Sequence, residues 1–251
     1  MIGFLRRKRE PAAPAPAIPP GLRVYAIGDI HGRLDLMDQL ISTMHADNEG
    51  RPAARVHLIF LGDLIDRGPD SAAVVERLAT DPPAFGTCHL ISGNHEEALL
   101  DAMRGNIETR AGWLAYGGRE TLISYGVSPA AIDAGGMLLD TAMHAAIPAS
   151  HLRFIESFHR SIRIGGYLFV HAGIRPGVAL EEQDVADMHW IRQDFLDDDR
   201  DHGVMVVHGH TITETVEMRS NRIGIDTGAY RTGRLTALGL EGVDRWMLQT
   251  A

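Results

Sequence analysis

Five short apolar runs in the chain each end in side chains that can bind a metal ion. Asp29 and His31 lie two residues apart, so on an extended segment they project to the same side. The remaining candidates in these motifs are Asp63 in GDLIDRG, Asn94 in GNHE, His171 in HAG and His210 in GHT. Carboxylate, amide and imidazole donors without a thiolate suit manganese, iron or zinc, with magnesium also acceptable, rather than a soft metal.

The number of these side chains indicates what they could do. Any one Asp or His at the end of a strand is more often a turn former or a surface group than a ligand, but five such motifs in order favour a metal site. Six ligands exceed what one catalytic ion needs. Two ions that share one carboxylate would use all six and hold a metal-activated hydroxide between them, which is the arrangement for in-line attack on phosphorus.

The segments that must position these groups have the composition of buried strands. RVYAIG, HLIFLG, CHLISG, YLFV and VMVV are rich in Val, Ile, Leu and Phe. Between them, segments such as LDLMDQLISTMHA and DSAAVVERLAT place apolar residues at three- and four-residue spacing, which predicts helices. The alternation predicts an α/β layered domain, and in open α/β sheets ligands bind beyond the carboxyl ends of the strands.

The ordered motifs GDIHGR, GDLIDRG, GNHE, HAG and GHT resemble the signature of the calcineurin-like metallophosphoesterases over about residues 22–240. The resemblance implies a four-layer α/β/β/α sandwich of two mixed sheets flanked by helices, with two metal ions. Its ligand assignments place Asp29 and His31 on the first metal, Asp63 between the metals, and Asn94, His171 and His210 on the second.

Two details of the motifs resemble the phosphoprotein phosphatase branch and its bacterial relatives. The forms DRG and GNHE match that branch, and Ile212 follows GHT where the wider superfamily often has a second ligand histidine. His208 is then surplus to the ligand set. It could face the cleft, but we expect a histidine that is packed or bonded to water.

The same resemblance makes His95 the general acid that protonates the departing oxygen, with Asp66 orienting and charge-stabilising its ring. Arg67 would clamp phosphate oxygens with its planar fork. Arg192 is either the second phosphate-binding arginine or the partner of nearby aspartates, and both readings stay open. Weaker candidates near the site are Arg33, Tyr230 and Arg231.

The composition of the chain limits the cellular compartment and the partners that we expect. The chain has 251 residues, a net charge of -9 and a single cysteine, Cys88, so no intrachain disulfide can form and a reducing cytoplasm is expected. No apolar stretch is long enough for a membrane span, and the absence of a basic stripe disfavours a nucleic-acid partner. The sequence does not indicate an oligomeric state.

Three regions differ in character. Residues 1–21 are basic and then proline-rich, and we expect them to be a disordered tail ahead of a metallophosphoesterase domain over 22–251. Residues from about 105 to 165 read as a helical insertion interrupted by glycines. This insertion resembles that of bacterial protein phosphatases and diadenosine-tetraphosphate hydrolases, so Trp113 and Tyr116 either line the substrate mouth or are buried in the helical cap.

The expected activity is hydrolysis of phosphoserine or phosphothreonine in proteins or peptides by direct attack of a metal-bridging hydroxide, with phosphotyrosine as a further candidate. Manganese is the expected metal, with iron, zinc or magnesium as alternatives. A hydrolase of dinucleoside polyphosphates such as diadenosine tetraphosphate uses the same motifs, so a nucleotide substrate stays open. A rival from another class is a phosphate-binding scaffold that has lost its chemistry, although the complete set of motif residues disfavours it.

Overall fold

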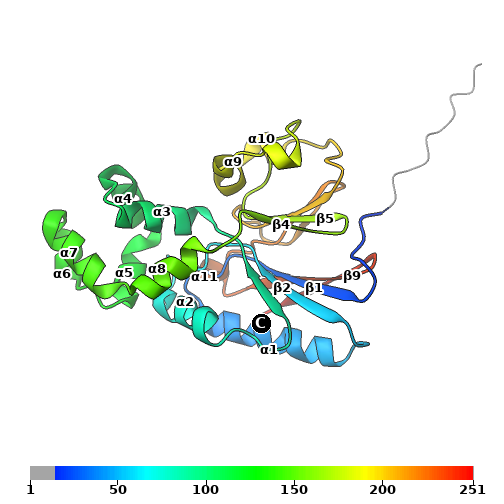
Figure 1. Ribbon diagram of the computed structural model, residues 1–251, viewed down its shortest axis with the longest axis horizontal. Coiled ribbons are helices and arrows are strands. Elements are labelled where there is room, and N and C mark those ends of the chain that lie inside the picture. The colour runs from blue at the N-terminus through cyan, green and yellow to red at the C-terminus, as the bar shows by residue number, and fades with distance from the viewer. Residues whose placement is uncertain (1–14, 251) are drawn as a thin grey trace, which may run out of the picture.

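A computed structural model describes residues 15–250 and contains two five-stranded sheets stacked face to face (Figure 1). The first sheet has the order β10-β9-β1-β2-β3. In it β1, β2 and β3 are parallel to one another, and β9 is antiparallel to both of its neighbours, β1 and β10. Its strands are β1 (Leu22–Ile27), β2 (Arg55–Phe60), β3 (Thr87–Leu90), β9 (Thr236–Glu241) and β10 (Asp244–Gln249). Both sheets are mixed, as the resemblance implies.

The second sheet has the order β4-β5-β6-β8-β7, with β5, β6 and β8 parallel to one another. Its strands are β4 (Ser161–Ile164), β5 (Tyr167–Val170), β6 (Met205–His208), β7 (Glu217–Met218) and β8 (Arg222–Gly224). The expected helical insertion therefore ends earlier than residue 165, because β4 already belongs to this sheet.

Helices cover the outer faces of both sheets. Figure 1 shows α1 (Leu34–Glu49) and α2 (Ser71–Thr80) below the first sheet, and α9 (Val185–Trp190) and α10 (Gln193–Leu196) above the second. The chain also contains α3 (Asn94–Met103), a 3₁₀ turn (Leu180–Glu182) and α11 (Ala229–Thr232). The order helix, sheet, sheet, helix is the expected α/β/β/α sandwich.

The insertion between β3 and β4 is helical and lies to one side of the sheets (Figure 1). It consists of α4 (Ile107–Trp113), a π-helical turn (Leu114–Gly118), α5 (Arg119–Ser124), α6 (Pro129–Ala134), α7 (Gly136–Ala146) and α8 (Ala149–Glu156). None of the helices in the described range 15–250 is long and apolar enough to cross a bilayer.

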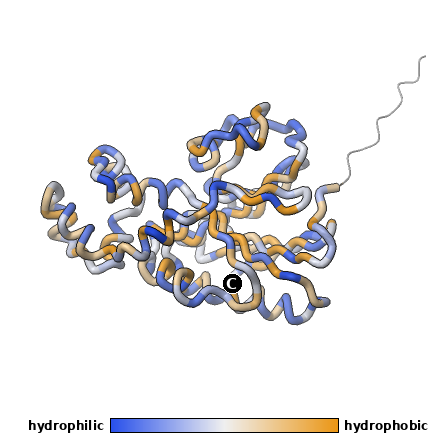
Figure 2. The backbone as a smooth tube through the Cα atoms, in the orientation of Figure 1, coloured by the Kyte–Doolittle hydropathy of each residue, from blue (hydrophilic) through white to orange (hydrophobic). Residues whose placement is uncertain are grey.

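Three apolar cores separate the four layers, because successive strand residues point to opposite faces of a sheet. In β1, Tyr25 and Ile27 pack under α1 and α2, whereas Val24 and Ala26 face the second sheet. A third core lies between the second sheet and α9 and α10. Figure 2 shows the hydrophobic residues concentrated along the strands, which explains why these runs lack the polar alternation of one-sided sheets.

Asp47 near the end of α1 ties that helix to the first sheet. Its carboxylate accepts hydrogen bonds from the hydroxyl of Tyr25 at 2.6 Å and from Nε1 of Trp246 at 3.0 Å. Arg51 donates to the same carboxylate at 2.8 Å and lies over the Trp246 ring at 3.5 Å. One side chain thus joins α1 to β1 and β10.

The boundary expected at residue 22 is too late. Ile18 is buried in the core between the two sheets, and its backbone N–H donates to the carbonyl of Gly242 at 2.7 Å. The carbonyl of Ala17 accepts from Gly166 at 3.0 Å. The prolines around this segment removed the apolar pattern that would have predicted packing. The basic residues 6–9 lie outside the described residues.

Candidate metal centre

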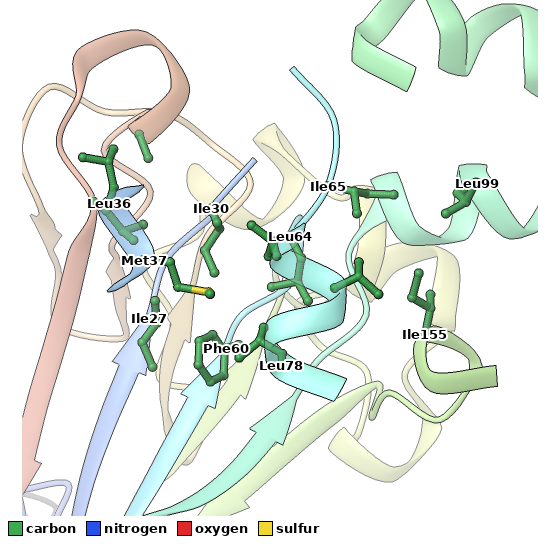
Figure 3. Close-up of a cluster of buried hydrophobic side chains, with 14 of the residues drawn as sticks. Ile27, Ile30, Leu36, Met37, Phe60, Leu64, Ile65, Leu78, Leu99 and Ile155 are labelled. Atoms are coloured by element: carbon green, nitrogen blue, oxygen red, sulfur yellow. The ribbon is translucent and has the colours of Figure 1, made fainter. Parts of the chain in front are cut away.

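The expected ligands follow the ends of five different strands and meet at one place. Apolar residues next to or near them in sequence anchor the connecting loops: Ile30, Leu64 and Ile65 are buried in the core under α1 and α2, as Figure 3 shows. The side chains brought together are Asp29, His31, Asp63, Asn94, His171 and His210, all at most 7% exposed. Apolar anchors beside polar ligands hold the site rigid without filling it.

Three of the ligands converge on one point. Nε2 of His171 lies 2.9 Å from Oδ1 of Asn94 and 3.2 Å from Nδ1 of His210, and the last two atoms lie 2.9 Å apart. Nδ1 of His171 donates to the carbonyl of Leu61 at 2.8 Å, so Nδ1 carries the proton and Nε2 is unprotonated, with a lone pair free for a metal ion. Donor atoms about 3 Å apart are spaced like neighbouring ligands at about 2.1 Å from one ion, so these residues fit a metal.

Asp63 lies between two such groups. Its Oδ1 is 3.4 Å from Nε2 of His171, and its Oδ2 is 3.6 Å from Nε2 of His31. Nδ1 of His31 bonds the carbonyl of Ile65 at 2.8 Å, so Nε2 of this ring is also unprotonated. Asp63 belongs both to the group with His171 and His210 and to the group with His31 and His95, each with donor atoms within 4.8 Å of one another. One carboxylate facing two donor groups has the geometry of a bridging ligand.

Asp29 lies at the edge of this cluster. Its two carboxylate oxygens accept from the backbone N–H of His210 at 3.2 and 3.0 Å. Within residues 15–250 it belongs to neither of the two donor groups. A Cβ on Gly209 would lie 2.0 Å from Asp29 Oδ1, so only glycine lets the GHT turn approach this carboxylate.

The electrostatics of the site favour metal binding. Burial lowers the pKa of His31 to about 3 and that of His210 to about 2, so both rings are neutral, the form that binds metals. Burial alone would raise the pKa of Asp63, but His171, His95 and the other nearby histidines hold it well below its ordinary value. His31, His210 and Asp63 are therefore unprotonated at neutral pH, which is the form that binds a metal ion.

Glu96 in the GNHE motif organises the backbone of the site, a role that we did not predict. Its Oε2 accepts from the backbone N–H groups of Asp63 and Gly93 at 2.9 Å each, and its Oε1 accepts from that of Leu64 at 2.8 Å. Glu96 is the third residue after the N-cap Gly93 of α3, and an acidic residue at that position is a known helix-start signal. That signal could have identified it.

His95 and Asp66 form a buried pair. Nδ1 of His95 lies 2.6 Å from Oδ2 of Asp66. Burial alone would lower the pKa of His95, but the charge of Asp63 and the bond to Asp66 raise it. The Asp66 carboxylate also accepts from Nε1 of Trp113 at 2.7 Å and from Oγ1 of Thr121 at 2.6 Å. Trp113 is thus buried in the cap, and Thr121, which carries no motif, was missed.

Arg67 lies over the centre. Its Nη1 is 3.1 Å from Nε2 of His31 and its Nη2 is 3.1 Å from Nε2 of His95. Its backbone N–H donates to the carbonyl of Gly117 in the π-helical turn at 3.2 Å, and its guanidinium lies 4.8 Å from the ring centre of Tyr230. The insertion and Tyr230 together set the position of the guanidinium.

Arg192 lines the same pocket as Arg67. It donates to Oγ1 of Thr211 at 3.3 Å and forms no ion pair within residues 15–250. The neighbouring Asp187 and Asp194 pair with Arg175 instead. The reading of Arg192 as an aspartate partner therefore has no contact to support it.

The other candidates fall outside the centre. Arg33 pairs with Asp35 at 2.7 Å, and Arg231 is exposed. His208 is buried, with its ring edge-on to Phe195 at 5.2 Å, so it is a packed histidine as expected.

The backbone is strained where the chemistry is concentrated. Five non-glycine residues in the described range have positive φ, a conformation that costs of order 1–3 kcal/mol per residue. All five are expected site residues: His31 (47°), Asp63 (49°), Asp66 (74°), Arg67 (69°) and His210 (63°). The surrounding cores and the hydrogen bonds of Glu96 hold these turns.

Two pockets open beside the centre. One of about 570 Å³ is lined by Arg67, His95 and Arg192 and by the aromatic rings of Trp113, Tyr116 and Trp190. The other, of about 550 Å³, lies on the side of Tyr230 and shares Arg67 and Tyr116 with the first. Tyr116 is 72% exposed and so lines the mouth.

Comparisons with known proteins agree with this fold. The family model of the calcineurin-like phosphoesterases matches residues 22–234. A symmetrical bis(5'-nucleosyl)-tetraphosphatase of Acidovorax sp. (strain JS42) is 30% identical over 163 residues, which cover 64% of this chain and 47% of that protein. The chain thus spans about half the length of that relative.

One further relative and one solved structure cover more of the chain. Serine/threonine-protein phosphatase 2 of Escherichia coli (strain K12) is 27% identical over 225 residues, which cover 85% of this chain and 90% of that protein. The crystal structure of a cold-active protein-tyrosine phosphatase of a Shewanella species has a TM-score of 0.54 and 21% identity, covering 93% of this chain and 83% of that one.

Proposed function

The chain belongs to the calcineurin-like phosphoesterase family, and from this premise we propose that it is a metal-dependent phosphomonoesterase acting on phosphoserine and phosphothreonine in proteins. The observation that carries the proposal is the position of Asp63 between His31 on one side and His171 and His210 on the other, beside the His95–Asp66 pair. A scaffold that only binds phosphate would need neither a shared carboxylate nor a buried proton donor.

Six of the residues at the centre would bind the metal ions. Two metal ions would be held by the side chains of Asp29, His31, Asp63, Asn94, His171 and His210. When bound, such ions supply positive charge for the phosphate and lower the pKa of water. Manganese suits this mixed oxygen and nitrogen set, and iron, zinc or magnesium could replace it.

Protein side chains would complete the reaction. Arg67, joined by Arg192 across the first pocket, would hold the phosphate oxygens. Nε2 of His95 would give its proton to the departing oxygen, while Nδ1 keeps its own proton and donates it in a hydrogen bond to Asp66, whose negative charge stabilises the ring before the transfer. The proposed reaction forms no phosphoenzyme. In keeping with this, Cys88 lies in β3 with its side chain packed on the core under α1 and α2, away from the proposed metal ligands in the chain's fold.

The shape of the mouth supports access by a protein side chain. Trp190 is 49% exposed and Tyr116 72% exposed, so the first pocket opens directly onto the surface. A second candidate function, hydrolysis of dinucleoside polyphosphates, is favoured by a different observation. The two pockets meet at Arg67 and Tyr116, and a scissile phosphate with a substituent on each side could occupy both.

One experiment separates the two substrates. Purified protein loaded with Mn²⁺ is assayed with phosphoserine and phosphotyrosine peptides and with diadenosine tetraphosphate, and Asp63→Asn serves as the control for contaminating phosphatases. We expect kcat/KM to be larger for the phosphoserine peptide. A preference for the dinucleotide by orders of magnitude would replace our first assignment with the second.

A substitution in the pocket adds a second criterion. Stacking of a base on an aromatic side chain contributes about 1–3 kcal/mol, so Trp190→Ala would raise KM for the dinucleotide by roughly 5- to 150-fold if a base stacks there. We expect a much smaller change for the phosphoserine peptide, which has no ring. Absence of p-nitrophenyl phosphate hydrolysis with Mn²⁺, Fe²⁺ or Zn²⁺ would favour the scaffold.

A further inference from the structure

Asp226, which follows β8, is a buried carboxylate with one oxygen unused. The residue is 1% exposed, and its Oδ1 accepts from the backbone N–H of Gly228 at 2.8 Å, at the start of α11. Its Oδ2 is buried and has no hydrogen-bond partner within residues 15–250. A buried acceptor without a partner carries a desolvation cost, so an unfilled oxygen at a functional site points to a missing ligand.

The backbone places Asp226 next to Asp29. The N–H of Ile225 donates to the carbonyl of His208 at 2.9 Å, which continues the alignment of β8 with β6 up to Asp226. On its other side, Ile225 touches Gly28, where an added Cβ would lie 2.7 Å from the Ile225 carbonyl oxygen. The backbones of Gly28 and Ile225 are therefore in direct contact, and Asp29 and Asp226 are the residues that come next in the two segments.

The charges of the site agree with that placement. Burial raises the pKa of Asp29 well above its ordinary value, and the next largest cause is the negative charge of Asp226, ahead of that of Asp63. Burial likewise raises the pKa of Asp226 to about 6, whereas the positive charges of Arg67 and Arg192 act to lower it. Asp226 thus adds negative charge on the Asp29 side of the centre.

We propose that Asp226 is a further acidic residue of the first metal position, acting through Oδ2 as a hydrogen-bond acceptor for water held by a divalent cation beside Asp29 and His31. The inference rests on the proposed function only in requiring a divalent cation at this centre. Acceptors of this kind orient the groups around a metal, and their loss typically weakens metal binding about 10- to 100-fold. The competing explanation is that Asp226 only caps the turn into α11 through Oδ1.

Asp226→Asn separates these explanations, because asparagine keeps an oxygen for the N–H of Gly228 and replaces only the other oxygen by an amide donor. The probe is Mn²⁺ alone, added to metal-free full-length protein and followed by isothermal titration and by the electron paramagnetic resonance signal of free Mn²⁺. We expect one of two Mn²⁺ sites to weaken by about 10- to 100-fold and the other to stay unchanged.

The matched control is Asp184→Asn, because Asp184 is an exposed aspartate that caps α9 by accepting from Ala186 at 2.9 Å. It should leave both Mn²⁺ dissociation constants unchanged. Asp226→Ser, which keeps a capping oxygen and loses the second one, should reproduce the loss seen with asparagine. Thermal unfolding provides a second readout: without metal, Asp226→Asn should unfold at the same or a higher temperature, because a repulsion with Asp29 is gone, whereas the rise caused by Mn²⁺ should shrink.

Unchanged Mn²⁺ binding in Asp226→Asn would overturn the inference and leave only the capping role. Wild-type protein that binds no Mn²⁺ would overturn it together with the proposed function. If two Mn²⁺ bind and Asp226→Asn weakens one, while no phosphate ester is hydrolysed, the proposed function fails and the role of Asp226 stands.

Discussion

Replacing His95 by asparagine is the sharpest test of the proton donor. The amide nitrogen of asparagine can occupy the place of Nδ1 and still donate to Asp66, but nothing replaces Nε2. That atom lies 3.1 Å from Nη2 of Arg67 and 3.8 Å from Oδ2 of Asp63, between the arginine that would hold the phosphate and the shared carboxylate. The substitution therefore removes the proton donor and leaves the metal ligands in place.

The size of the effect should depend on the leaving group. An alkoxide needs a proton, and a positioned acid contributes about 10²- to 10⁴-fold, so kcat/KM for a phosphoserine peptide should fall by that factor. Nitrophenolate leaves without protonation. The loss for p-nitrophenyl phosphate should be limited to one hydrogen bond of about 0.5–1.5 kcal/mol, which is up to roughly tenfold.

The assay compares kcat/KM for both substrates in wild type and in His95→Asn, with the metal content measured in parallel. His151→Asn is the matched control, since His151 is also buried and bonded through both ring nitrogens, to Tyr125 at 2.8 Å and to Glu76 at 2.7 Å. The control should leave the ratio of the two substrates unchanged. Equal losses on both substrates in His95→Asn, with metals retained, would refute the acid role.

Three other predictions concern the metal, the fold and the thiol. Asp63→Asn should lower the metal content and abolish turnover, and two bound metals with retained activity would contradict a bridging role. Asp47→Ala should lower the free energy of unfolding in urea by about 2 kcal/mol at pH 7, because Tyr25 and Trp246 each lose an acceptor. Burial alone would raise the pKa of Asp47, but the hydrogen bonds it accepts lower it. Its contribution is thus present above about pH 3.9 and lost as the pH falls further, so the two proteins should converge in acid; a constant difference would argue against this. Burial raises the pKa of Cys88 to about 11. Its reaction with a disulfide reagent at pH 8 should be roughly two orders of magnitude slower than in the unfolded chain, and equal rates would show an open thiol.

The proposed metal ligands could be predicted from the sequence because each one comes within a few residues after a strand, and ligands bind beyond the carboxyl ends of the strands in α/β sheets. The groups that hold the His95–Asp66 pair could not be predicted. Thr121 and Trp113 reach Asp66 from distant helices, and no local pattern encodes such contacts. The strand β4 was missed because the polar Ser161 and Arg163 interrupt its apolar residues, and β7 was missed because two residues are too few for a pattern.

The helical insertion has a consequence beyond substrate access. Since α4 and α5 supply Trp113 and Thr121 to Asp66, the insertion holds the carboxylate whose hydrogen bond raises the pKa of His95, the proposed acid. Swapping it between relatives would move the pH profile of the reaction together with substrate preference. A local opening of these helices would break the hydrogen bonds of Trp113 and Thr121 to Asp66 and would leave the proposed metal ligands in place. Under the proposed function, such an opening would lower the rate of the reaction without changing metal binding.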